Sequence, residues 1–394
     1  ASCSPKTHEA IFMDTLQACG LNKYLFEMAN IRNHDSWVHG QTPQEATAKA
    51  KDLVRMAVAR AGTLKALVET KVRVNPRALV VVGHAQSGGV AGLTAALGVA
   101  DQGYEVVLVE KEAELGGFGR RLTHTIEGAD INAHLDKLIE RATSHPKVQV
   151  LTQSLVVKFS GYRGNFTTEL IVGPGMYERK INHGALILAT GAGEYKPTEY
   201  YYGQDSRILT QVELSHRLEE RGSQDLKSVV MIQCVGSRNA DHVNCSRICC
   251  QSAVKNALHI KEQNPEALVC VLYRDIRTYG LLEDYYTQAR QKGVLFFRFD
   301  QNDPPVVEPT DDGINITFTD HVLGRPVSVP ADLLTLSAGM RPQDTDELAS
   351  IMKLARNTDG YLLEAHVKLR PVDMAADGLL VLSEVYYPGW RAYA

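Results

Sequence analysis

The stretch 78-ALVVVGHAQSGGVAGLTAALGVADQGYEVVLVE-110 decides the fold, because its periodicity changes twice. Residues 78–82 are apolar and mostly β-branched, which is typical of a fully buried parallel strand. A glycine-rich turn leads into the helical pattern of residues 91–104, and a second buried strand then ends at Glu110. A strand, a helix and a strand in this order form one βαβ unit. The stretch therefore predicts an α/β fold that contains a parallel sheet.

The turn of this unit has glycines where a dinucleotide site needs them. One glycine permits the tight turn, one lets the backbone approach the pyrophosphate, and one lets helix and strand pack closely. Gly89 and Gly92 fit the second and third positions, whereas the first would fall on Ser87. Either residues 84–87 extend the turn or the first glycine is lost. We expect the pyrophosphate of a bound dinucleotide over Gly88, Gly89 and Gly92, at the start of the helix.

Later features indicate that the dinucleotide is FAD. Glu110 ends the second strand 18 residues after Gly92, where an acid holds the ribose hydroxyls. A glycine doublet and an "ATG" run follow, and both are similar to motifs of FAD-binding enzymes with two dinucleotide-binding domains. Each glycine alone would indicate only a turn, so the prediction depends on the order of all these features. The expected FAD-binding residues are Gly88, Gly89, Gly92, Glu110, Lys111, Gly116, Gly117, Thr190 and Gly191.

A second strand–helix–strand unit, over residues 228–275, has cysteines where its glycine turn would be. Four of the seven cysteines lie in 233-QCVGSRNADHVNCSRICC-250, namely Cys234, Cys245, Cys249 and Cys250. Four thiolates suit an iron–sulfur cluster or zinc. No C-x-x-C pair is present, which argues against zinc knuckles and excludes a redox-active dithiol of that type.

The choice among ligands depends on the spacing of these cysteines. Adjacent Cys249 and Cys250 make a zinc tetrahedron awkward, whereas the wider cube of a four-iron cluster accepts both. Buried, unligated thiols would explain one or two cysteines rather than four. The sequence therefore favours a cluster and leaves zinc and unligated thiols open. Cys19 and Cys270 are interpreted as core residues, and Cys3 as structural or as part of a site whose other half is missing.

Composition excludes several classes of protein. The 394 residues are enough for about two or three domains. A formal net charge of -4 gives no electrostatic basis for binding nucleic acid. No stretch reaches the roughly 18 apolar residues of a membrane-spanning helix, and no basic segment precedes an apolar one as in a signal peptide. We expect a soluble, cytoplasmic protein, in which a cysteine cluster indicates metal or redox chemistry rather than disulfides.

The N-terminal segment is predicted to be mainly helical. A helical pattern ends at Gly20, and Pro43 opens a long run rich in Ala, Lys and Arg. The chain starts without Met, and we expect it to begin inside a domain. The expected division is a partial N-terminal domain over residues 1–75, an FAD-binding domain over 76–200 and 326–394, and an inserted second nucleotide-type domain over 201–325.

Several long stretches resemble one family, the A subunit of heterodisulfide reductase and its bacterial relatives. They include "DQGYEVVLVEKEAELGG", "IQCVGSRN", "CSRICC" and "VLYRDIRTYG" and run through almost the whole chain. The resemblance implies a thioredoxin-reductase-like flavoprotein with two dinucleotide-binding domains and FAD. It also implies one four-iron four-sulfur (4Fe-4S) cluster on Cys234, Cys245, Cys249 and Cys250.

The resemblance further implies two catalytic residues, Glu213 of the "TQVE" segment and Lys255 on the helix after the double cysteine. An acid and a base beside the flavin would steer its protonation. For each, a solvated helix charge is the alternative interpretation. The expected partners are B- and C-like subunits of heterodisulfide reductase, ferredoxin, and a hydrogenase or formate dehydrogenase module, and a homodimer is also expected.

This chain departs from the family in three places. We expect it to begin inside the family's N-terminal domain, and the given sequence has no ferredoxin run of the C-x2-C-x2-C-x3-C type. Its end, "LVLSEVYYPGWRAYA", replaces the glycine-containing turn and the helix expected to close the flavin site. The expected function is electron transfer, by relay or by bifurcation, through FAD and an iron–sulfur cluster. The alternatives are a stand-alone NAD(P)H-dependent disulfide oxidoreductase and a metal-binding scaffold without flavin.

Overall fold

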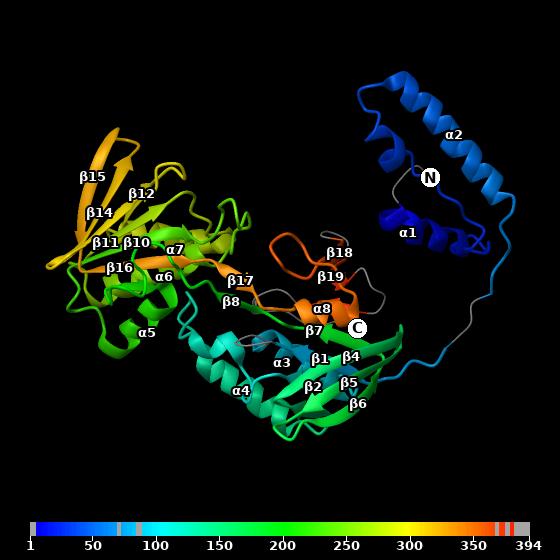
Figure 1. The fold of residues 1–394 in the computed structure, drawn as a ribbon, viewed down its shortest axis with the longest axis horizontal. Helices are drawn as coiled ribbons and strands as arrows, with labels where there is room; N and C mark the ends of the chain where they lie inside the picture. Colours follow the sequence, from blue (N-terminus) through cyan, green and yellow to red (C-terminus); the bar gives the residue numbers. More distant parts are fainter. Residues whose placement is uncertain (1–4, 69–71, 84–88, 367–369, 375–378, 382–394) are drawn as a thin grey trace. The chain divides into compact units, whose positions relative to one another are not determined.

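The computed structural model describes residues 5–68, 72–83, 89–366, 370–374 and 379–381 (Figure 1). Gly88, the turn at 84–87, Cys3 and the C-terminal segment 382–394 lie outside these residues. The chain divides into two compact units, Ala1–Arg73 and Val74–Ala394. No helix within the described residues has both the length and the apolarity needed to cross a bilayer.

The first unit is mainly helical, as predicted. It contains α1 (Pro5–Ala18), the short π-helix η1 (Arg32–Ser36) and α2 (Pro43–Ala61). Gly20 lies in the left-handed conformation beyond α1, and Pro43 occupies the first turn of α2, where its missing N–H leaves no hydrogen bond unmade. None of the residues of α2 is buried.

The second unit begins with the predicted βαβ element and builds a sheet of order β18-β19-β20-β7-β1-β2-β3. β1 is buried on both faces: Val80 packs toward helices α3 and α4, whereas Leu79 packs toward the small sheet β4–β5–β6 and α8. This explains its continuous apolar run, since a parallel strand covered on both sides has no polar face. The strands are β1 (Ala78–Val82), β2 (Val106–Glu110), β3 (Val148–Leu151), β7 (Ala185–Leu188), β18 (Glu364–His366), β19 (Arg370–Met374) and β20 (Leu379–Val381), covered by α3 (Val90–Asp101), α4 (Ile131–Ser144), α8 (Asp346–Met352), β4 (Ser154–Tyr162), β5 (Asn165–Val172) and β6 (Tyr177–His183).

A second parallel sheet, of order β12-β11-β10-β16-β9, is built the same way. One face packs against α5, α6 and α7, and the other packs against a three-stranded antiparallel sheet (Figure 1). Its elements are β9 (Ile208–Thr210), β10 (Ser228–Val235), β11 (Leu268–Tyr273), β12 (Leu295–Arg298), β16 (Leu333–Ala338), α5 (Gln211–Arg221), α6 (Cys249–Gln263), α7 (Glu283–Gln291), β13 (Val306–Thr310), β14 (Gly313–Asp320) and β15 (Arg325–Ala331).

The expected end of the inserted domain, at residue 325, is too early. β16 lies between β10 and β9, so this strand belongs to the second sheet. All six of its residues are buried, and a fully buried run indicates a parallel strand without indicating which of two parallel sheets it joins. We propose that the insert extends to Ala338; the other domain limits stay predictions.

Two short strands connect the sheets. β8 (Ala192–Glu194) leaves the first sheet, β17 (Met340–Pro342) returns from the second, and the two pair antiparallel with Met340 opposite Glu194. Figure 1 shows them side by side between the two sheets. The residues of this ribbon are therefore close to both halves of the second unit.

Candidate functional site

The described glycines of the predicted FAD site meet where β1 gives way to α3. Gly89 caps the N-terminus of α3, and a Cβ placed there would lie 2.2 Å from the carbonyl oxygen of Gly116. A Cβ on Gly92 would lie 2.7 Å from Cγ2 of Val82, so any side chain at this position would force α3 away from β1. The two glycine motifs, far apart in sequence, thus form one close backbone contact at the carboxyl ends of β1 and β2.

Glu110 lies fully inside this region, with 1% of its surface exposed. Its Oε1 accepts a hydrogen bond from the backbone N–H of Glu112 at 2.9 Å, and Oε2 has no hydrogen-bond partner among the described residues. Burial raises the pKa of Glu110 to about 8, although the N–H groups of Glu112 and Lys111 counteract the shift. An unpaired buried acceptor costs free energy, so a hydroxyl donor would be favoured here. The residues therefore fit the ribose of FAD.

The remaining predicted FAD-site residues lie at the same edge of the sheet. Gly116, Gly117 and Gly191 all have positive φ, at 114°, 48° and 66°. Thr190 is nearly buried and follows β7, the neighbour of β1. The structure therefore gathers the described members of the predicted set around the ends of β1, β2 and β7.

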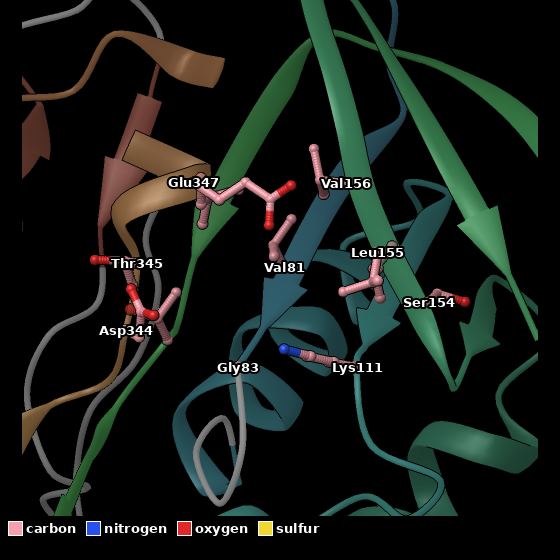
Figure 2. A pocket seen from close by; sticks show the side chains of 12 residues that line it. Val81, Gly83, Lys111, Ser154, Leu155, Val156, Asp344, Thr345 and Glu347 are labelled. Atoms are coloured by element: carbon pink, nitrogen blue, oxygen red, sulfur yellow. The ribbon is translucent and has the colours of Figure 1, made fainter. Parts of the chain in front are cut away.

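Lys111 and Thr190 also line a cavity of about 40 Å³ on the face of the sheet opposite α3. Figure 2 shows the Lys111 side chain near Gly83, with Asp344, Thr345 and Glu347 on the other wall. A cavity of this size holds water rather than a nucleotide.

The four cysteines of the second domain come together at the end of β10. Cys234 lies near the end of β10, within an irregularity in its pairing with β16. Cys245 lies on the loop between β10 and α6, and Cys249 and Cys250 open α6. Burial, and then the charges of Cys250, Cys234 and Cys245, raise the pKa of Cys249. Burial, with Cys234 and Cys245, raises the pKa of Cys250 to about 11. The four thiols thus lie within one another's electric field.

The backbone around these cysteines is strained. Cys234, Arg238 and Arg247 have φ of 64°, 57° and 63°, a left-handed conformation that residues with a Cβ rarely adopt. Such strain is common at functional sites, where the surrounding structure holds it in place. Within the described part of the chain, no three His, Cys, Asp or Glu side chains are close enough to share a single metal ion.

The two predicted catalytic residues lie on the neighbouring helices α5 and α6 of the inserted domain, on the side of the FAD-binding domain. Glu213 accepts hydrogen bonds from the Tyr202 hydroxyl and the Thr210 backbone N–H, both at 2.7 Å, and completes a capping box at the start of α5. Lys255 on α6 donates to the carbonyl oxygen of His124 at 3.1 Å, and burial lowers its pKa. Each residue thus has a structural contact besides its predicted role.

Two residues beside Glu213 were not predicted from the sequence. Glu194 on β8 is nearly buried and pairs with Arg121 at 3.4 Å. Burial raises its pKa to about 7, and the charge of Glu213 adds to this shift. The sequence offers only a weak signal, the acid three residues after Gly191, because the environment arises when β8, α5 and the segment around Arg121 pack together.

Comparisons with known proteins define the class of this fold. Residues 77–232 match the family model described as pyridine nucleotide-disulphide oxidoreductase. A thioredoxin reductase from T. acidophilum superposes with a TM-score of 0.52 at 13% identity, over 82% of this chain and 93% of that chain. The thioredoxin reductase of Lactococcus lactis gives 0.51 at 16% identity, over 80% and 92%. The fold is therefore that of thioredoxin-reductase-like flavoproteins with two dinucleotide-binding domains, as predicted.

Sequence relatives identify the family. The chain is 34% identical to an iron–sulfur A subunit of CoB–CoM heterodisulfide reductase from Methanopyrus kandleri, over 97% of this chain and 72% of the relative. It is 32% identical to the A subunit of the H(2):CoB–CoM heterodisulfide, ferredoxin reductase of Methanothermobacter marburgensis, over 96% and 71%. The chain belongs to the family of heterodisulfide reductase A subunits and is an oxidoreductase, and its fold and family support FAD as a cofactor. Both alignments span more positions than this chain has residues, so each relative has segments without a counterpart here.

Proposed function

We propose that the chain is an electron-transfer component of a heterodisulfide reductase-like complex, with FAD in its FAD-binding domain and a 4Fe-4S cluster in the inserted domain. It passes or bifurcates electrons between a low-potential donor or acceptor and iron–sulfur partner subunits. The observation that carries this proposal is the convergence of four thiols at the end of β10. In a nicotinamide-dependent enzyme this turn would hold the second dinucleotide.

FAD, when bound, supplies the redox chemistry that exchanges electron pairs with single electrons. The protein contributes binding and orientation. Gly89 and Gly92 let the backbone approach the pyrophosphate, and the N-terminus of α3 offers amide donors to its charge. Oε2 of Glu110 has no partner among the described residues, and it would accept a hydrogen bond from the ribose.

The cysteine site suits a cluster by the chemistry of its ligands, which are soft sulfur donors from the end of β10, the following loop and the start of α6. Cys234, Cys245, Cys249 and Cys250 would hold it. A single zinc ion draws its sulfurs to about 2.3 Å from one centre. Adjacent Cys249 and Cys250 favour the wider cube of a four-iron cluster over a single zinc ion.

Glu213 and Lys255 are proposed to lie near the flavin ring. Glu194, paired with Arg121, lies within the electric field of Glu213. Glu194 has a pKa raised to about 7, so it holds or releases a proton near neutral pH. The Tyr202 hydroxyl and Glu213 would extend this proton-holding group. These residues belong to both domains and to the ribbon between them.

The partners are proposed from the relatives' names. The Methanothermobacter marburgensis relative is named for hydrogen, a heterodisulfide and ferredoxin. We extend this to B- and C-like subunits, ferredoxin and a hydrogenase or formate dehydrogenase module for this chain. A homodimer and a cytoplasmic location are part of the same proposal.

The electron donor tests the function. We expect the purified chain to accept electrons from reduced ferredoxin or viologen and not from NADH or NADPH, since the thiols occupy the nucleotide turn and a cluster's negative charge repels phosphates. Flavin bleaching is followed by absorbance under anaerobic conditions. Rapid bleaching by stoichiometric NADH, without a partner protein, would instead support a stand-alone disulfide oxidoreductase, the activity that the matching family model describes. A colourless protein would support the flavin-free scaffold.

A further inference from the structure

Residues 274–277, which follow β11, contact the loop between β10 and α6, residues 236–248. They were not among the predicted site residues. Their sequence, Arg-Asp-Ile-Arg, carries two guanidinium groups and a carboxylate. Arg274 and Asp275 bond to the loop, and Arg277 pairs with Asp275.

Arg274 holds the backbone of the loop. Its side chain is nearly buried and donates from Nη2 to the carbonyl oxygen of Ser237 at 2.9 Å and from Nη1 to that of Arg238 at 2.8 Å. Arg238 is one of the residues with positive φ. The planar guanidinium fork therefore fixes the strained turn that follows Cys234.

Arg277 lies beside the cysteines through Asp275. Its guanidinium pairs with the Asp275 carboxylate, and the carbonyl oxygen of Asp275 accepts from Sγ of Cys250 at 3.7 Å. Although burial counteracts the shift, the charge of Cys245 raises the pKa of Arg277. Arg238, on the loop, donates from Nη1 to Sγ of Cys234 at 3.9 Å, and the backbone N–H of Arg247 donates to Sγ of Cys245 at 3.4 Å. Two of the four sulfurs thus accept from an N–H donor, and the Arg238 donor carries a positive charge.

Asp275 joins the two arginines. Its Oδ2 lies 2.6 Å from Nη2 of Arg238 and 3.5 Å from Nη2 of Arg277. It orients both guanidinium groups and offsets part of their charge. The side chains of Arg238 and Arg277 are 21% and 31% exposed, so solvent screens them only in part.

We propose that Arg277, positioned by Asp275, raises the reduction potential of the group bound by the four cysteines; this rests on the proposed iron–sulfur function. When a cluster takes up one electron from a reductant its negative charge grows, and no proton needs to move. A positive charge and N–H donors at the ligand sulfurs stabilise the reduced form more than the oxidised form. Asp275 acts in the opposite sense, because its charge is negative.

The test is a potentiometric titration of the whole chain, monitored by electron paramagnetic resonance, with iron and acid-labile sulfide measured on every sample. Arg277→Met should keep both contents and make the cluster about tenfold less reduced at a fixed potential, which is about 59 mV for a one-electron couple. Asp275→Asn should instead make the cluster more reduced at the same potential. Arg277→Lys keeps the charge and loses the planar fork, so its reduction potential should lie between those of Arg277→Met and the unchanged chain.

Arg247→Met is the matched control. It removes an exposed arginine of the same loop whose contact with Cys245 is a backbone N–H at 3.4 Å, which the substitution keeps. We expect little change from it. Equal potentials in Arg277→Met and the unchanged chain would overturn the proposal, as would cluster loss from both Arg277 variants, because the side chain would then serve assembly. Absence of sulfide and of a signal from the unchanged chain would refute the iron–sulfur function instead.

Discussion

Replacement of Glu110 by Gln tests the flavin site, because it should raise the stability of the FAD-free chain and lower its affinity for FAD. The pKa of this carboxyl is raised by burial from 4.5 to about 8 in the FAD-free chain. Folding therefore binds a proton between these two pH values, and the free energy of unfolding falls as the pH rises from about 4.5 to about 8. Gln keeps the shape and the acceptor for the Glu112 N–H but does not titrate.

The size of the effect follows from the shift. One pKa unit corresponds to about 1.4 kcal/mol, so at pH 7 titration of Glu110 costs the FAD-free chain about 3 kcal/mol. Glu110→Gln should match the unchanged chain at pH 4.5 or below and exceed its stability by about this amount at pH 7. Urea unfolding of both FAD-free proteins over this pH range measures the difference in stability. Each protein buries one unpaired polar group, Oε2 in the unchanged chain and the amide in the variant, so this cost largely cancels in the difference.

FAD binding should respond in the other direction. The ribose hydroxyls favour an ionised acceptor, so the affinity of the unchanged chain for FAD should rise with pH up to about 8. The loss of a hydrogen bond to a charged group, worth about 1.5–3 kcal/mol, predicts about 10- to 100-fold weaker FAD binding by Glu110→Gln above pH 8. Parallel stability curves together with equal FAD affinities would refute the assignment of Glu110 to the ribose.

Three further predictions concern the cysteines, the contact between α3 and β1, and Glu213. Replacing any one of the four clustered cysteines by Ala should remove most of the iron and acid-labile sulfide, measured by elemental and sulfide analysis; zinc without sulfide in the anaerobic parent protein would contradict this. Gly92→Ala should lower the free energy of unfolding by about 1–3 kcal/mol through overpacking against Val82, and Val82→Ala in the same chain should restore part of the loss in urea unfolding; equal loss in single and double variants would contradict the contact. Glu213→Ala should lower the free energy of unfolding by about 1 kcal/mol because the capping box is lost, whereas Glu213→Gln should keep most of it, so a change of flavin reactivity in the Gln variant alone reports on charge.

The architecture could be predicted because its signals are local. The apolar run of β1, the glycine turn and the acid that ends β2 follow one another along the chain, and each has one physical reason. The assignment of β16 to the FAD-binding domain failed because its buried apolar pattern would be the same in either sheet. Only its long-range pairing with β10 distinguishes the two sheets.

The candidate site was predicted only in part. The four cysteines are conspicuous because they are few and crowded, and the structure brings them into one electrostatic group. The role of Thr210 and Glu213 as a capping box has a sequence signature, T-x-x-E, but the Tyr202 contact with Glu213 does not. Glu194 and the segment 274–277 acquire their surroundings only from tertiary packing, so no local pattern marks them.

The central claim is that this chain carries FAD and one 4Fe-4S cluster together. The measurement that tests it most directly is the visible absorption spectrum of protein purified without oxygen, with flavin, iron, acid-labile sulfide and zinc determined on the same sample. We predict flavin bands on a broad iron–sulfur shoulder, with about four iron and four sulfide for each FAD. Flavin bands without iron or sulfide, zinc in their place, or a colourless protein would contradict it.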